Sequence, residues 1–133
     1  MLIRTNLSSA IKYIKDDPVR PNIPAQVRIQ KHFEMYHTSG AVICTAFVDT
    51  IPTTEQELLD SSPGTIAIFY SVWSYMRKAG RNIVFEALDL AKERGMTQFV
   101  TMSPKTDMAE KFHLSNGATL LAENESTNNF EYK

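Results

Sequence analysis

Two patterns of apolar positions alternate along the chain, one typical of strands and the other of helices. The longest apolar run, residues 65–75, has apolar or aromatic residues on both alternation sets, which predicts a central strand covered on both faces. After a polar, basic loop, apolar residues recur at helical spacing from about Ile83 to Ala91, and Gly95 is a natural end for this helix. A second buried strand is predicted at residues 98–102. This alternation predicts a layered α/β domain.

The remaining elements are shorter and depend on capping and turn signals. Thr54 and Glu57 have capping spacing, which predicts a short helix that Pro63 and Gly64 end. The other predicted elements are a strand at residues 2–5, a helix capped by Ser8 or Ser9 and running through Lys15, an ordered loop at 16–24, hairpin strands at 26–36 and 41–49, a helix at 106–115, and strands at 118–121 and 129–132. We expect one domain, residues 1–133, built on a mixed, mostly antiparallel sheet.

Composition narrows the classes of function. The chain has 14 Lys plus Arg against 15 Asp plus Glu, a formal charge of -1, which offers no global attraction for nucleic acid or an anionic membrane. Its single cysteine, Cys44, excludes an internal disulfide and a Cys-cluster zinc site. The three histidines lack metal-ligand spacing, so no metal site is predicted. The five glycines form neither Gly-x-Gly-x-x-Gly nor a P-loop, which disfavours dinucleotide and nucleotide chemistry. The N-terminus lacks a signal-peptide pattern, so the cytoplasm is the expected location.

The basic loop before the Ile83 helix is the most informative segment. Arg77, Lys78 and Arg81 concentrate positive charge there, and Gly80 lets a ligand approach the backbone closely. A helix N-terminus has unpaired N–H groups that phosphate oxygens can accept from. The loop therefore predicts a phosphate site, and a solvated basic turn is the alternative.

Two segments carry a resemblance to a known family. The run 77–82, Arg-Lys-Ala-Gly-Arg-Asn, resembles the Arg/Gln-x-x-Gly-x-Gly/Ala acyl-CoA loop of the GNAT superfamily of N-acetyltransferases, with Asn82 in place of the last small residue. Downstream, the run 109–118 resembles the family's Ala-x-x-Phe-Tyr-x-x-x-Gly-Phe segment, with His113 in the position of the tyrosine. The resemblance covers residues 65–118. The variant at 112–118, together with Asp-Pro-Val-Arg-Pro at 17–21, resembles a small phage-type and environmental branch.

The resemblance implies a GNAT-like fold in which strands four and five splay apart and acetyl-CoA, or another acyl-CoA, binds as co-substrate. Pantetheine would contact the backbone of strand four, and amides from Lys78 to Ile83 would cradle the diphosphate. The cofactor-binding residues so implied are Val72, Ser74, Arg77, Lys78, Ala79, Gly80, Arg81, Asn82 and Ile83.

His113 is the catalytic candidate, as a general acid in place of the family's tyrosine. The alternative is a histidine that only packs. The family's base is often a carboxylate on strand four, and residues 66–75 contain none. Tyr70, Ser71, Asp49, Glu34 and His37 remain candidates, with none favoured.

The predicted activity is therefore acyl-CoA-dependent N-acyl transfer, with acetyl-CoA as donor and a small-molecule or peptide amine as the partner that accepts. The alternative is a non-catalytic acyl-CoA-binding or protein-interaction module on the same fold, favoured by the missing carboxylate and the altered tyrosine. A third alternative, contact of the basic loop with nucleic-acid phosphate, is the weakest, and neither nucleic acid nor membrane is an expected partner. A homodimer and a monomer both stay open.

Overall fold

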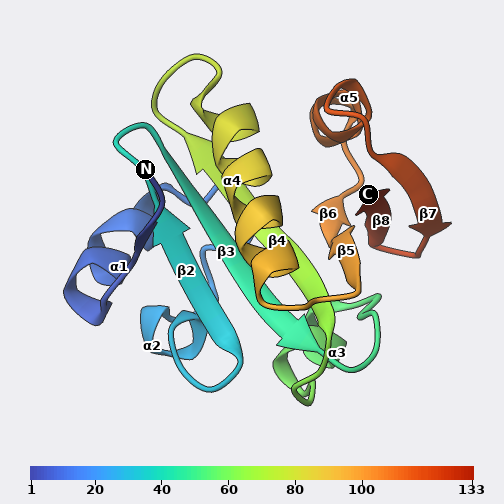
Figure 1. Cartoon of the computed structure of the whole chain (residues 1–133), viewed down its shortest axis with the longest axis horizontal. Coiled ribbons are helices and arrows are strands. Elements are labelled where there is room, and N and C mark those ends of the chain that lie inside the picture. Colours follow the sequence, from blue (N-terminus) through green and yellow to red (C-terminus); the bar gives the residue numbers. More distant parts are fainter.

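The computed structural model describes all residues, 1–133, and contains a single eight-stranded sheet (Figure 1). The strand order is β1-β2-β3-β4-β5-β8-β6, with β7 paired to β8. The strands are β1 (Ile3–Arg4), β2 (Phe33–His37), β3 (Ala41–Val48), β4 (Ile66–Ser74), β5 (Gln98–Thr101), β6 (Ser103–Pro104), β7 (Thr119–Glu123) and β8 (Thr127–Tyr132). Only β4 and β5 pair in parallel. The predicted mixed, mostly antiparallel sheet is confirmed.

β4 is the central strand and separates two apolar cores. Its side chains alternate between them, so Ile68 and Tyr70 pack in one core and Ala67 and Phe69 in the other. Burial on both faces explains why this segment is the most continuously apolar in the sequence.

The helices cover both faces of this sheet. They are α1 (Leu7–Tyr13), α2 (Ala25–Arg28), α3 (Glu55–Leu59), α4 (Ala79–Glu93) and α5 (Asp107–Ser115), with a 3-10 turn at Ile14–Asp16. α4 lies across β3 and β4, whereas α5 lies beside β7 and β8 (Figure 1). None of the helices has the length and apolarity needed to cross a membrane.

Three predicted boundaries are wrong. α4 begins at Ala79 rather than near Ile83, because Lys78 adopts a left-handed conformation (φ 68°) that turns the chain into the helix four residues earlier. Residues 26–32 are not a strand: Ala25–Arg28 form α2, and β2 begins only at Phe33. The cap of α1 is Asn6, whose side chain accepts from the Ser9 amide, rather than Ser8 or Ser9.

Candidate acyl-CoA site at the β4–β5 fork

The two parallel strands β4 and β5 stay paired for only part of their length. They are in register from Ile66 opposite Gln98 to Phe69 opposite Thr101, and the last bond runs from the Met102 amide to the Phe69 carbonyl (3.1 Å). At this point Tyr70 is an extra residue in β4, because Cys44 of β3 pairs with Ser71 and the next residue of β3 pairs with Phe69. A bulge bends its strand and ends regular pairing. Beyond it β4 runs to Ser74 with no partner on the β5 side, so the predicted splaying is confirmed.

A buried arginine occupies the fork where the strands part. Arg20, 5% exposed, donates to the carbonyl of Tyr70 on β4 and to that of Met102 just after β5 (2.8 Å for the latter). The guanidinium thus satisfies two carbonyls that the interrupted ladder leaves without strand partners.

The loop that carries Arg20 is itself fixed by a buried ion pair. Asp17 accepts from the amides of Val19 (2.8 Å) and Arg20 (3.0 Å), and it pairs with Arg28 (2.6 Å). Both side chains of this pair are fully buried. Arg28 also donates to the carbonyls of Arg20 and Ile23.

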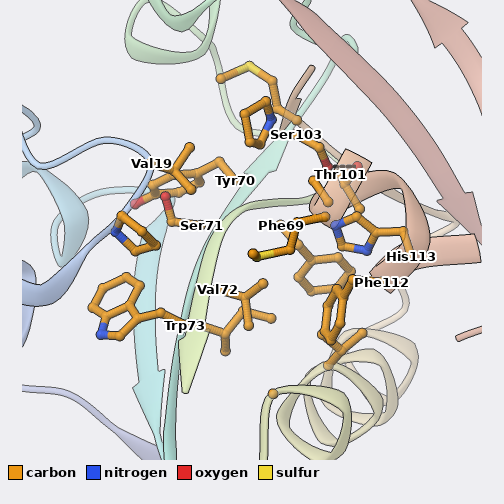
Figure 2. Close-up of a pocket in the computed structure, with 18 of the residues that line it drawn as sticks. Val19, Phe69, Tyr70, Ser71, Val72, Trp73, Thr101, Ser103, Phe112 and His113 are labelled. Atoms are coloured by element: carbon orange, nitrogen blue, oxygen red, sulfur yellow. Dashed lines mark hydrogen bonds between the residues drawn. The ribbon is translucent and has the colours of Figure 1, made fainter. Parts of the chain in front are cut away.

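A cavity of about 590 Å³ opens at the fork and extends to both faces of the sheet. Figure 2 shows Val19, Tyr70, Ser71 and Trp73 on one side of β4, and Phe112 and His113 on the other. No Asp, Glu, Lys or Arg lines this cavity. Its wall is apolar, apart from backbone groups, hydroxyls and the imidazole of His113.

Some of the sequence-predicted residues lie in the cavity wall and others lie outside it. Val72, Ser74, Gly80 and His113 line it. Arg77, Lys78, Ala79, Arg81, Asn82 and Ile83 do not.

The open edge of β4 presents backbone groups to this cavity. The Tyr75 amide donates to the Gly40 carbonyl (2.7 Å), which fixes the hydrogen-bonding phase of the antiparallel β3–β4 pair. Because hydrogen-bonded and non-hydrogen-bonded pairs alternate, Val72 and Ser74 direct their amides and carbonyls away from β3, toward the edge that β5 has left. An extended ligand can bond there as a further strand would.

The start of α4 offers fewer free amides than the resemblance implies. The Ala79 amide donates to the Met76 carbonyl (3.2 Å) and the Asn82 amide to the Lys78 carbonyl (3.1 Å). The amides of Lys78, Gly80 and Arg81 have no acceptor in the protein, whereas Ile83 is fully buried in the core. The site therefore presents three amides at the positive end of a 15-residue helix.

The charged side chains of this loop are exposed. Arg77, Lys78 and Arg81 take part in no ion pair, and the Arg81 guanidinium lies over the Phe85 ring (5.3 Å to its centroid). Three cations without an acidic partner thus lie beside three unpaired amides, which makes this surface locally positive on a protein with nearly balanced charge.

His113 lies in the cavity wall opposite β4, and it is 5% exposed. Its Nδ1 is hydrogen-bonded to the hydroxyl of Tyr132 (2.7 Å), and the Asn116 side chain donates to the same hydroxyl (3.3 Å). Nε2 makes no hydrogen bond to the protein. Burial lowers the pKa of His113 to about 4, so the imidazole is neutral at pH 7.

Of the five candidate bases, two line the cavity and three lie elsewhere. Tyr70 and Ser71 line the cavity. Glu34 instead bonds Arg94 (2.6 Å) and Tyr36, His37 bonds Thr5 (2.7 Å), and Asp49 lies in a different surface depression. The structure brings no carboxylate to the cavity.

Sequence reasoning missed four functional or supporting residues: Arg20, Asp17, Arg28 and Tyr132. Charged residues in the proline-rich 16–24 loop were the available signal for Arg20 and Asp17, but the pattern does not indicate that their side chains turn inward.

The single cysteine, Cys44, is buried beside Arg28. Burial raises the pKa of Cys44 to about 11, so its thiol serves only as a neutral neighbour of Arg28.

Comparison with known proteins gives matches at the level of structure alone. No family model and no curated protein matches the sequence. The GNAT domain of S. lividans PAT is similar in structure, with a TM-score of 0.68 and 11% identity over 98% of this chain and 88% of that one.

Two further solved structures are similar. PaiA N-acetyltransferase from Thermoplasma acidophilum, in complex with coenzyme A, matches with a TM-score of 0.56 and 14% identity over 76% of this chain and 59% of that one. Malonyl-CoA decarboxylase from Agrobacterium vitis matches with a TM-score of 0.66 and 19% identity over 78% of this chain, which spans about a third (33%) of the decarboxylase. With its mixed sheet, its bulged β4 and the fork beside α4, the chain has the fold of the GNAT acetyltransferases.

Proposed function

We propose that this protein binds an acyl-CoA, with acetyl-CoA as the simplest donor, and transfers the acyl group to an amine. The observation that carries the proposal is the continuity of unpaired donors. The open edge of β4 at Val72 and Ser74 leads into the free amides of Lys78, Gly80 and Arg81. Pantetheine fits the first part as an added strand and the diphosphate fits the second. The coenzyme A complex of the similar PaiA acetyltransferase supports this assignment.

The reaction needs a nucleophile, a polarised carbonyl and a proton for the leaving sulfur. The amine nitrogen forms a bond to the thioester carbon, the C–S bond breaks, and the proton lost by the amine goes to the thiolate. An open-edge amide of β4 polarises the carbonyl. His113 is neutral at pH 7 because burial holds its pKa near 4, so it acts as a relay: Nε2 takes the proton from the attacking amine and passes it to sulfur.

Isothermal titration with acetyl-CoA, using ATP as nucleotide control, tests the donor site. Arg77→Gln/Arg81→Gln is expected to weaken acetyl-CoA binding by about tenfold or more, because charge-assisted contacts to phosphate are lost. Lys12→Gln/Lys133→Gln removes the same charge from exposed positions elsewhere and should bind normally. Absence of binding by the unmodified protein contradicts the proposal.

A second candidate is a non-catalytic acyl-CoA-binding module, favoured by the absence of any carboxylate from the cavity. Turnover of acetyl-CoA against a panel of amines separates the two functions, since a module binds without turnover. Malonyl-CoA belongs in the same panel as an alternative donor, because malonyl-CoA decarboxylases are similar in structure.

A further inference from the structure

The half of the cavity next to the 16–24 loop is left free when the donor lies against α4. It is lined by Pro18, Val19, Tyr70, Ser71, Trp73 and Met102. The bulge produces this grouping. Ser71 lies opposite Cys44 and Trp73 opposite Val42, so both side chains fall on the face that Tyr70 also occupies, away from Val72 and α4. Figure 2 shows the same separation across β4.

This half of the cavity is lined by no charged residue, and the neighbouring carboxylates lie outside its wall. Asp16 accepts from the Tyr75 hydroxyl (2.7 Å), and Asp17 is buried against Arg28. Glu55 accepts from the Asn22 side chain (2.8 Å) and faces Arg20 (3.8 Å). None of these carboxylates lines the cavity, so none lies in its wall to pair with a cationic substrate or to take its proton.

An alkyl amine is poorly suited to such a pocket. It is an ammonium ion at neutral pH, and burial without a counter-ion strongly disfavours a charged group. An aromatic amine is uncharged at pH 7, since its lone pair is delocalised into the ring. It enters without losing a proton, and its ring matches the indole of Trp73 and the apolar side chains around it.

Two residues in this half of the cavity have a hydroxyl without a partner in the protein, Tyr70 and Ser71. The hydroxyl of Ser71 is buried, with the residue 4% exposed, and makes no hydrogen bond in the protein. Figure 2 shows Ser71 on the Val19 side of β4. A buried polar group without a hydrogen-bond partner is destabilising. A ligand N–H that donates to Ser71 Oγ would supply the hydrogen bond that this hydroxyl lacks in the protein.

We infer that the acceptor is an uncharged aromatic amine, held between Trp73 and Val19 with its N–H groups donating to Ser71. The inference rests on the proposed acyl transfer and specifies its substrate class. The aromatic nitrogen forms the amide bond, the C–S bond breaks, and the proton released by the nitrogen passes to sulfur through His113. No further reactant is needed.

Aniline and benzylamine form a matched pair, because they have nearly the same size and differ in charge at pH 7. With acetyl-CoA as donor, aniline is expected to have a kcat/KM at least about tenfold above that of benzylamine. Preference for benzylamine overturns the inference and leaves the proposed acyl transfer intact. Acetyl-CoA binding with no turnover of either amine, or of any other amine in the panel, overturns both; absence of acetyl-CoA binding also overturns both.

Substitutions at two positions test the same pocket independently. Ser71→Ala should raise KM for aniline by about tenfold with acetyl-CoA affinity unchanged. Val19→Asp places a carboxylate in the half-buried wall and should shift selectivity toward benzylamine, whereas Val19→Asn should not. Unchanged kinetics in Ser71→Ala, or equal effects of Asp and Asn at position 19, contradict the inference.

Discussion

Arginines lie at both ends of the open part of β4, and the two ends use them in opposite ways. At the closed end, Arg20 and Arg28 are buried, and they donate to backbone carbonyls and to Asp17. At the open end, Arg77 and Arg81 are exposed and have no acidic partner. The first pair stabilises the fork, because its buried guanidinium groups bond to carbonyls and to Asp17 within the protein. The second pair is available to a ligand, because nothing in the protein competes for it.

The largest effect is expected at the closed end. Arg28→Met leaves the fully buried carboxylate of Asp17 without its partner, which should lower the free energy of unfolding by about 3–5 kcal/mol. Urea denaturation measures the change. Adding Asp17→Asn to Arg28→Met removes the uncompensated charge and should recover part of the loss. If Arg28→Met lowers the free energy of unfolding by less than about 1 kcal/mol, as loss of an exposed ion pair does, the arginines at the two ends do not differ in their contribution to stability.

The contrast between the two ends also explains what sequence alone could predict. The apolar period of residues 65–75 and the helical period after them depend on local spacing, so the central strand, α4 and the basic loop could be predicted. The motif placed Gly80 and the exposed cations in a loop just before the helix, whereas the structure places Gly80 and Arg81 in the first turn of α4. Arg20 could not be placed, because its partners, the carbonyls of Tyr70 and Met102, are 50 and 82 residues away along the chain.

A histidine between the two ends makes stability depend on pH. The pKa of His113 is about 4 in the folded protein, against about 6.5 in the unfolded chain. Between these values the unfolded state binds more protons, so the stabilisation is complete above pH 6.5 and is lost as the pH falls toward 4, by about 3 kcal/mol.

Denaturation curves at several pH values isolate this contribution as the difference between the unmodified protein and His113→Phe. His37→Phe is the matched control, because His37 is only half-buried, although burial lowers its pKa as well. If the free energy of unfolding depends on pH in the same way in His113→Phe and in the unmodified protein, His113 is not a neutral, buried histidine. Its proposed role as a proton relay would then be wrong.

Arg20 tests whether the fork depends on the closed end. Arg20→Lys keeps the charge but loses the planar pair of donors, so one of the carbonyls of Tyr70 and Met102 is left unpaired, at a cost of about 2 kcal/mol. Acetyl-CoA affinity should fall as well, because the edge of β4 is no longer fixed. Arg81→Lys at the open end should leave the free energy of unfolding unchanged. Equal losses in the free energy of unfolding for Arg20→Lys and Arg81→Lys would contradict the distinction between structural arginines at the closed end and ligand-binding arginines at the open end.

The smallest effect on the fold, and the sharpest on the ligand, is expected at Gly80. A methyl group there would lie 3.6 Å from Ser74 and 3.7 Å from Phe112, which are ordinary contacts, so Gly80→Ala folds normally and gains about 0.5 kcal/mol from helix propensity. The methyl group nevertheless occupies cavity space beside the free amides, and acetyl-CoA binding should weaken by about tenfold. Gly40→Ala is the contrasting variant, because its methyl group would meet Ala79 at 2.9 Å and displace the loop itself, so both stability and affinity should fall. If Gly80→Ala binds acetyl-CoA as well as the unmodified protein does, the diphosphate does not approach this backbone, and the open end of β4 loses its assigned ligand.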